Sequence, residues 1–403
     1  MKRKETEHFH DLLIVGAGAS GLMAAISAAR QGVKVALLEH TDKIGRKLLI
    51  TGNGRCNLTN QIQRPEYYRS HHGQIAWQVI SNFTEDDTIA FFQDLGLVIR
   101  ERNGGIYPWS NQAASVLRVL KSELFHLGIT VYYRAEPVKL YRDEKRACFC
   151  CETRNECYLG KALILAAGSQ AAEKTGSDGS GYMLARMFGH SIYPPLPALV
   201  PLMAKESCFH RLSGVRAEGR ITLYADGKEL ASDVGELQLT EYGISGIPAF
   251  QVSRYASEAL YQKRYVTAEL DFCPNLTVQE LEDLIERQTQ KGIRTREVLI
   301  GILNEKLADE FHSITENEKE LARRIKCFSS TITGTKGFDH CQVCAGGVPL
   351  TEIDPSTMES KKTKGLYLAG ELLDVDGACG GYNLQWAWAS GYLAGKRAAE
   401  KIS

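Results

Sequence analysis

The residues best suited to chemistry in this 403-residue sequence are three glycines at a spacing that binds a dinucleotide. Gly16, Gly18 and Gly21 form a GxGxxG between an expected strand and an expected helix. These glycines permit a tight turn and let the backbone approach a pyrophosphate, while the helix amino terminus offers N–H groups and a positive dipole end. Glu39 ends the second expected strand, where a carboxylate would accept a hydrogen bond from a ribose 2′-hydroxyl and repel a 2′-phosphate.

A second polar segment, GRKLLITGNGRCNLTN at 45–60, is too rich in glycine, asparagine and arginine to be core. Its candidate ligands for phosphates or the edge of a flavin ring are Arg46, Lys47, Asn53, Arg55 and Asn57. Gly52 and Gly54 would let backbone approach a planar ligand. Cys56 lies among them, where its side chain could contact a flavin; a nucleophilic thiol is the alternative.

A third segment, near the carboxyl end, repeats the order of strand, glycine-rich turn and helix. Glu371 follows an expected strand and could hold a ribityl hydroxyl, with Asp374 and Asp376 as nearby alternatives. Gly380 and Gly381 precede a helix whose amino terminus could face the flavin N1 and O2 region, where negative charge develops on reduction. NAD has no part that would bind at such a second site, whereas FAD contacts both the amino-terminal and the carboxyl-terminal segment. The sequence therefore predicts FAD.

The elements that must position these residues suggest a chain folded in several parts. The apolar runs 12–15 and 33–38 are typical of parallel strands buried on both faces, and helices are expected at 84–95, 111–127 and 382–400. The prolines at 194–197 indicate a crossing into another domain. We therefore expect an α/β fold with a discontinuous Rossmann-like FAD-binding domain at 1–192 and 330–403, a β-rich insert at 193–273 and a helical insert at 274–329, which opens with a capping box at Thr277 and Glu280.

Composition narrows the choice of partners. Lysine plus arginine and aspartate plus glutamate both number 48, so the charge balance favours a small or amphipathic substrate over nucleic acid or an anionic membrane. The first ten residues lack an apolar run, which predicts a cytoplasmic protein. The eleven cysteines are expected to be free thiols, and neither their spacing nor that of the histidines predicts a metal site. A redox role for the Cys341 and Cys344 pair is the less favoured alternative to ordinary strand residues.

Seven motifs, spread over nearly the whole chain, carry a resemblance to a known family. They are GAGASG, TGNGRCNLTN, GGIYPWS, TEYGISG, TGTKGFD, AGGV and the segment from Gly370 to Gly395. In this order they resemble the BaiN-like, or YhiN-type, bacterial flavoproteins, a group that includes aminoacetone oxidases. The resemblance implies a two-dinucleotide-binding-type fold with a β-barrel-like insert and a helical insert, and non-covalent FAD. With the residues above it gives the expected FAD positions: Gly16, Gly18, Ala19, Ser20, Gly21, Glu39, His40, Arg46, Lys47, Asn53, Gly54, Arg55, Cys56, Asn57, Val138 (through its backbone to adenine), Gly168, Glu371, Asp374, Asp376, Gly381 and Asn383.

The favoured activity is the NADH- or NADPH-dependent reduction of a carbon–carbon double bond conjugated to a ketone, because the family name implies reduction of a 3-oxo-bile acid at its Δ4,6 bonds. No second GxGxxG followed by a helix is visible, so a nicotinamide would have to bind without its own Rossmann domain. An oxidase of a small amine such as aminoacetone, producing hydrogen peroxide, is the first alternative, and an RNA-modifying flavoprotein the remote one. Weak candidates for the proton donor are Arg55, Tyr107, Tyr242 and Tyr382. The oligomeric state is left open.

Overall fold

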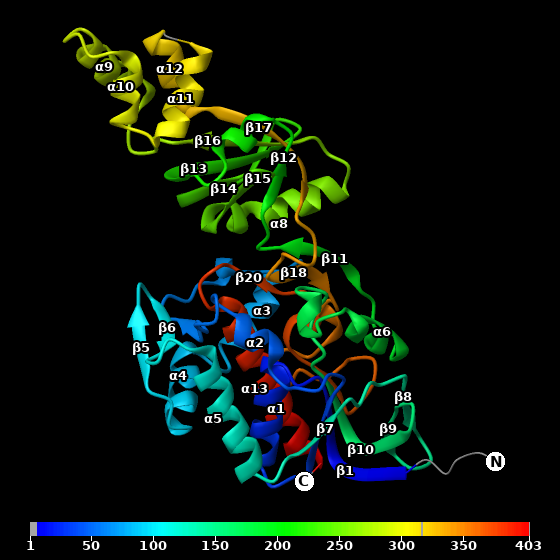
Figure 1. Ribbon diagram of the computed structural model, residues 1–403. Helices are drawn as coiled ribbons and strands as arrows, with labels where there is room; N and C mark the ends of the chain where they lie inside the picture. Colours follow the sequence, from blue (N-terminus) through cyan, green and yellow to red (C-terminus); the bar gives the residue numbers. More distant parts are fainter. Residues whose placement is uncertain (1–5, 316, 403) are drawn as a thin grey trace. The chain divides into compact units, whose positions relative to one another are not determined.

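The computed structural model describes residues 6–315 and 317–402, and the chain divides into two compact units (Figure 1). The first unit comprises the residues up to Pro195 and from Val343 onward, and the second comprises Leu196–Gln342. The chain leaves the first unit in β11 (Tyr193–Ala198), which pairs with β18 (Val343–Gly347), the strand in which it returns. The first unit is therefore built from two stretches of sequence that lie far apart.

The first unit combines a mainly parallel sheet with helices and short hairpins. Its other strands are β1 (Thr6–Val15), β2 (Val35–Glu39), β3 (Thr59–Asn60), β4 (Tyr68–Arg69), β5 (Ile99–Arg102), β6 (Gly105–Pro108), β7 (Thr130–Tyr133), β8 (Lys139–Asp143), β9 (Cys148–Glu152), β10 (Glu156–Leu165), β19 (Leu366–Leu368) and β20 (Asp376–Gly377). Its α-helices are α1 (Ala19–Ala29), α2 (Arg46–Ile50), α3 (Gly73–Ile80), α4 (Glu85–Asp94), α5 (Ala113–His126), α6 (Ser180–Met187) and α13 (Tyr382–Ile402). Short 3₁₀ turns are η1 (Pro65–Tyr67), η2 (Glu173–Thr175), η3 (Leu350–Glu352) and η4 (Gly370–Leu372).

The parallel part of the sheet has the order β7-β2-β1-β10-β19, and the antiparallel hairpin β8–β9 continues it beside the first half of β10. Its central strands are apolar without alternation because both faces are covered: residues 12–15 and 35–39 are all buried. The four cysteines of 148–157 are buried strand residues of β9 and β10.

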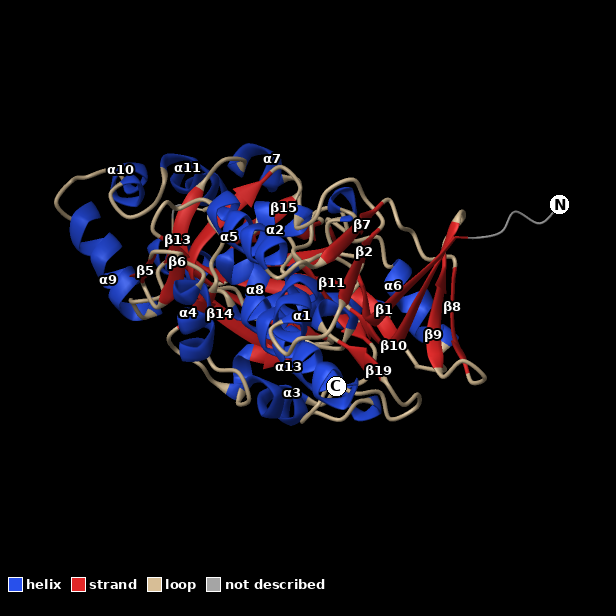
Figure 2. Ribbon diagram, turned by 90° about the horizontal axis from the view of Figure 1, so that it is seen from below, coloured by secondary structure: helices blue, strands red, loops and turns tan. Residues whose placement is uncertain are grey.

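Helices α1 and α13 lie together on one side of this sheet (Figure 2). Two glycines of α13 allow the close contact: a Cβ at Gly391 would lie 2.4 Å from the carbonyl oxygen of Ser20, and one at Gly395 would lie 2.2 Å from that of Ala24. Backbone therefore packs against backbone. The helix that follows the GxGxxG is thus positioned by a helix from the other end of the unit.

The second unit is a closed six-stranded barrel with a helical extension. The barrel order is β12 (Leu202–Ala204), β15 (Gly243–Gly246), β14 (Lys228–Thr240), β13 (Arg216–Ala225), β16 (Val266–Asp271) and β17 (Phe328–Thr335). The helices are α7 (Cys208–Leu212), α8 (Ile247–Tyr261), α9 (Val278–Thr289), α10 (Thr295–Ile300), α11 (Glu305–Ile314) and α12 (Glu318–Lys326). The predicted capping box is present at the start of α9: Thr277 Oγ1 accepts the Glu280 N–H, and the Glu280 carboxylate accepts the Thr277 N–H.

Two predicted boundaries need correction. The boundary at 330 falls inside β17, which closes the barrel by pairing with β16 and β12, so residues 330–342 belong to the second unit. The helical segment is also not separate from the barrel. Phe311 of α11 packs with Phe272 and Phe328 at ring centroid distances of 6.0 and 5.9 Å, so barrel and helices share one hydrophobic core.

A buried histidine gives the first unit a pH-dependent stability. His190 Nδ1 lies 2.7 Å from Glu352 Oε2, and its Nε2 lies 2.9 Å from Ser360 Oγ. Ser360 Oγ already accepts the N–H groups of Lys362 and Thr363, so its hydroxyl donates to an unprotonated Nε2. Burial lowers the pKa of His190 below its ordinary value, and the carboxylate of Glu352 opposes this only in part.

The unfolded chain therefore binds a proton at His190 more readily than the folded protein does. The contribution of neutral His190 to the free energy of unfolding is complete above about pH 6.5, the ordinary pKa of histidine, and is lost as the pH falls below that value. We expect the free energy of unfolding, measured with urea, to fall between pH 7 and pH 5.5, and to fall less in His190→Gln. An equal fall in both proteins would contradict this role.

No helix in residues 6–315 or 317–402 is long and apolar enough to cross a membrane.

Candidate functional site

The glycine-rich turn has the geometry that a pyrophosphate needs. Gly16 has φ +102°, and a Cβ there would lie 2.4 Å from the carbonyl oxygen of Ala166, so only glycine fits between the two strands. Gly18 is the N-cap of α1, with no side-chain cap, and a Cβ there would have no atom within 4 Å. The space beside Gly18 at the amino end of α1 is therefore open, as anion binding there requires.

Glu39 lies where the sequence placed it, at the carboxyl end of β2, and it is 7% exposed. Its Oε2 accepts the Ala17 N–H at 3.0 Å, and its Oε1 accepts the Thr41 N–H at 2.8 Å. His40 Nδ1 lies 3.3 Å from Oε1. Each carboxylate oxygen has a second lone pair, so Glu39 can hold the turn in place and still accept a ribose hydroxyl.

The adenine contact expected through the Val138 backbone stays a prediction, and the structure restricts it to one backbone group. The Val138 N–H donates to the carbonyl oxygen of Glu152 at 2.8 Å, next to the pairing of β8 with β9. This N–H is therefore not the group that would bind adenine, and the prediction is left with the carbonyl. Gly168, which follows β10 at the carboxyl edge of the sheet, has φ +75° and suits a close approach of backbone to a ligand.

Glu371 and Lys47 come together from opposite ends of the first unit. Lys47 Nζ lies 2.5 Å from Glu371 Oε2, which also accepts the Ser169 hydroxyl at 2.9 Å. Arg46, in contrast, donates to the carbonyl oxygen of Lys174. The structure thus joins three segments of the predicted site: the polar loop, the end of β10 and the turn after β19.

The turn after β19 is held by the last helix. Trp386 Nε1 donates to the Gly370 carbonyl and Ser390 Oγ accepts the Gly370 N–H, both at 3.0 Å. Trp388 Nε1 donates to the Leu58 carbonyl, also at 3.0 Å, so both tryptophans are core residues and fix two site segments. Asn383 pairs with the Gly377 backbone: its Oδ1 accepts the N–H and its Nδ2 donates to the carbonyl. This pairing makes Asn383 a residue that shapes the loop.

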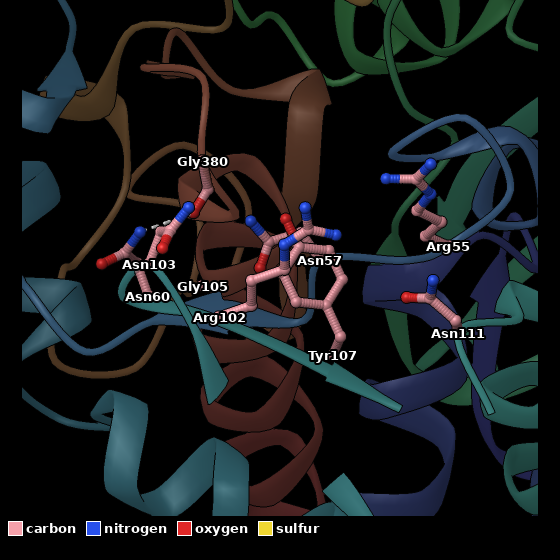
Figure 3. Close-up of a pocket in the computed structure, with 9 residues that line it drawn as sticks. All are labelled: Arg55, Asn57, Asn60, Arg102, Asn103, Gly105, Tyr107, Asn111 and Gly380. Atoms are coloured by element: carbon pink, nitrogen blue, oxygen red, sulfur yellow. Dashed lines mark hydrogen bonds between the residues drawn. The ribbon is translucent and has the colours of Figure 1, made fainter. Parts of the chain in front are cut away.

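One pocket of about 270 Å³ lies between the polar loop and the β5–β6 hairpin (Figure 3). Figure 3 shows the side chains of Asn57, Arg102 and Tyr107 at its centre and those of Arg55 and Asn111 on one side. The lining residues are Arg55, Asn57, Asn60, Arg102, Asn103, Gly105, Tyr107, Asn111 and Gly380. Two arginines and four asparagines give this pocket hydrogen-bond donors, acceptors and positive charge, and no aliphatic side chain lines it.

The structure brings two of the four candidate proton donors, Arg55 and Tyr107, to one pocket. Tyr242, in contrast, belongs to the second unit, where Lys336 Nζ lies 4.4 Å from the centre of its ring. Tyr382 is 5% exposed and its hydroxyl donates to the Ile62 carbonyl; burial raises the pKa of this phenol to about 12. These contacts argue against Tyr382 as the proton donor.

Burial also bears on the alternatives for the cysteines. Burial raises the pKa of the Cys56 thiol to about 12, which argues against a nucleophilic Cys56. Cys341 and Cys344 are buried as well, and Cys344 lies within β18. No group of three or more side chains in residues 6–315 and 317–402 is arranged to hold a metal ion.

Sequence reasoning missed one constellation, formed by Asp374 and His71. Asp374 is fully buried, and its Oδ2 accepts the Ser70 hydroxyl at 3.1 Å and the backbone N–H of His71 at 3.0 Å. The ring nitrogen Nδ1 of His71 lies 3.0 Å from the same oxygen. The partners lie 303 residues apart in sequence. Only the adjacent Ser-His pair could have drawn attention to residues 70–71.

The residues present fit FAD. Asn57 Oδ1 and Asp374 Oδ1 are buried oxygens without a hydrogen-bond partner among the described residues, and both belong to segments predicted to contact the flavin. Gly18 faces open space at the amino end of α1. A dinucleotide that runs from this turn toward the start of α13 would supply hydrogen bonds that these oxygens lack. The individual FAD contacts stay predictions.

Comparisons with known proteins agree with this geometry. The model of the HI0933-like protein Rossmann domain matches residues 10–397. The chain is 42% identical to the 3-dehydro-bile acid delta(4,6)-reductase of Clostridium scindens, over 96% of this chain and 98% of that protein. It is 31% identical to the ribosomal RNA dihydrouridine synthase of Haemophilus influenzae, over 95% of this chain and 97% of that protein.

Solved structures show the same fold at low sequence identity. The 3-ketosteroid-delta4-(5alpha)-dehydrogenase from Rhodococcus jostii has a TM-score of 0.52 at 15% identity, covering 99% of this chain and 98% of its own. A flavocytochrome c3 fumarate reductase in its open conformation has a TM-score of 0.53 at 15% identity, and the match covers 98% of this chain and 79% of that chain. Fold, relatives and site together define an oxidoreductase of the FAD-binding Rossmann class. The chain belongs to the HI0933-like family, which confirms the resemblance to BaiN-like proteins and the predicted fold class.

Proposed function

We propose that this chain uses FAD and NADH or NADPH to reduce a carbon–carbon double bond conjugated to a carbonyl group. The observation that carries the proposal is the 42% identity, over nearly the whole chain, to a 3-dehydro-bile acid delta(4,6)-reductase. The ribosomal RNA dihydrouridine synthases point to the same bond type, because dihydrouridine is uridine whose double bond beside the C4 carbonyl has been reduced. Reduced FAD supplies the hydride in such a reaction.

The chain's own residues suit this role. The N–H groups at the start of α1 would hold the pyrophosphate, and the amino end of α13 would stabilise negative charge on the reduced ring. The glycines at 380 and 381 have φ +126° and +102°, and a Cβ at Gly381 would lie 3.0 Å from Asn57 Oδ1. Because Gly381 has no side chain, the two flavin-side segments can approach each other this closely.

A second candidate substrate is uridine in RNA, and the pocket in Figure 3 favours it. A steroid nucleus needs mostly apolar walls, whereas this pocket is lined by arginines and asparagines. Arginine and asparagine side chains can hydrogen-bond phosphate oxygens and the edge of a uracil ring. The formal net charge of zero still argues against extensive RNA binding, so the steroid-like substrate stays the first candidate.

Anaerobic spectroscopy of the purified holoenzyme tests the proposal. We expect NADH or NADPH to bleach the flavin band, and a 3-oxo-4,6-dienoyl steroid to restore it with loss of the conjugated chromophore. Restoration by a uridine-containing ribosomal RNA fragment, and not by the steroid, would identify the second candidate. Failure of both nicotinamides to bleach the band would contradict the proposal, and peroxide formed from aminoacetone without a nicotinamide would favour an oxidase.

A further inference from the structure

Asp374 and His71 form a pair in which a buried carboxylate holds the imidazole ring of a partly exposed histidine. Asp374 is fully buried, and burying a carboxylate is costly unless it is paired and hydrogen-bonded. All three hydrogen bonds described above converge on Oδ2, while Oδ1 has no partner among the described residues. A carboxylate held in this way is well suited to fix an imidazole ring.

His71 is restrained on two sides and open on a third. Its Nδ1 lies 3.0 Å from Asp374 Oδ2, which fixes this nitrogen as the donor. The ring of Tyr193 stacks on the imidazole, with 4.1 Å between centroids and 28° between planes. The side chain is nevertheless 49% exposed. Its Nε2 is therefore the nitrogen left to exchange a proton with a substrate or with solvent.

The place of the pair in the fold connects it to the flavin segments. Asp374 follows η4, which contains Glu371, and lies two residues before β20. Strand β20 pairs with β4, the strand that ends at Arg69, so Ser70 and His71 are carried beside the segment that leads to Gly380 and α13. The buried carboxylate thus lies between two predicted flavin contacts, at the carboxyl edge of the sheet, where ligands of such folds bind.

From this arrangement we infer that His71 is the proton donor of the reduction, and that Asp374 is its positioning residue. The inference rests on the proposed function. A hydride adds to the β-carbon of the conjugated double bond, and the electron pair of that bond moves to the α-carbon and carbonyl. His71 Nε2–H then gives its proton to the α-carbon, and the N–H electron pair stays on Nε2. The other ring proton stays on Nδ1, hydrogen-bonded to Asp374.

The test compares His71→Gln with a matched control, His72→Gln, which changes the neighbouring histidine and leaves the Asp374 contacts in place. In stopped-flow experiments with the reduced holoenzyme, His71→Gln should slow reoxidation by the conjugated substrate by about 100-fold or more, the usual contribution of a general acid. Reduction by NADPH and reoxidation by ferricyanide, which needs no proton, should be unchanged. His72→Gln should match the parent in all three reactions.

A pH profile adds a readout that packing alone would not change. The reoxidation rate of the parent should fall as the imidazole loses its proton, and this limb should be absent in His71→Gln. The groups that face the ring are Asp374 and Tyr193, with Arg69 and Asp376 on the paired strands β4 and β20. The charge of the first of these groups can be removed by Asp374→Asn, which keeps the shape of the side chain.

A third readout does not depend on catalysis. In ¹⁵N nuclear magnetic resonance spectra at high pH, neutral His71 should carry its proton on Nδ1 in the parent, and Asp374→Asn should shift it toward Nε2. The inference is overturned if His71→Gln keeps the rate and pH profile of the parent, or if the tautomer is the same in both proteins. If neither conjugated substrate reoxidises the parent, the proposed function fails and the proton-donor role fails with it, whereas loss confined to His71→Gln supports both.

Discussion

Replacing Gly395 with alanine is expected to destabilise the first unit by at least about 3 kcal/mol, the upper part of the range for overpacking a core. Alanine is a better helix former than glycine by about 1 kcal/mol, so helix propensity alone predicts the opposite sign. The steric effect dominates because the new Cβ would lie 2.2 Å from the carbonyl oxygen of Ala24 and 2.8 Å from its Cα. These are backbone atoms of α1, which cannot move aside as a flexible side chain would.

Urea unfolding of the apoprotein, followed by tryptophan fluorescence, measures this effect. The matched control is Arg397→Ala in the same helix, because the ion pair of Arg397 with Glu400 is exposed and contributes little. A stabilised or unchanged Gly395→Ala protein would show that α1 and α13 do not pack backbone against backbone.

The second large effect is expected from Gly18→Val, which should abolish tight FAD binding while the fold survives. Gly18 has φ −80° and ψ −168°, an extended conformation that valine adopts readily, and a Cβ there meets no atom within 4 Å. The valine methyl groups would fill the space in front of the α1 N–H groups. We expect FAD binding at least about 100-fold weaker, equivalent to about 2.8 kcal/mol.

Titration of the apoprotein with FAD gives the dissociation constant, and urea unfolding checks the fold. Gly334→Val is the control, because Gly334 lies in β17 of the other unit and its Cβ would meet only Met203 Sδ at 3.8 Å. Gly18→Val protein that still binds FAD like the parent would show that the pyrophosphate does not lie at this turn.

Local patterns in the sequence predicted the parts of the fold that local physics determines. The helix expected at 84–95 is α4, Glu85–Asp94, because Thr84 and Asp87 form a capping box, and that expected at 111–127 is α5, Ala113–His126. Buried apolar runs identified β1 and β2 for the same reason. The GxGxxG and Glu39 lie together because their spacing belongs to one strand–helix–strand unit.

The remainder depends on contacts between distant segments, which no local pattern encodes. The boundary at 330 was wrong because β17 joins the barrel through pairing with strands more than 60 residues earlier, such as Thr331 with Thr267. The bonds from the Asn383 side chain to the backbone of Gly377 were likewise not visible in the sequence, and the contact of Asn383 with FAD stays a prediction. The pairing of His71 with Asp374 also depends on the tertiary fold. Residue types thus indicated the cofactor, whereas the candidate acid appeared only in three dimensions.

The packing of α13 on α1 has a consequence for biosynthesis. The ribosome makes α1 at residues 19–29 and α13 only at 382–402, after the whole second unit. Until then, the face of α1 that receives Gly391 and Gly395 lacks its partner, and the Gly370 turn lacks Trp386 and Ser390. The second unit can fold co-translationally, whereas the nucleotide-binding unit must wait for its last helix. We therefore expect the cofactor to be incorporated only after α13 has been made.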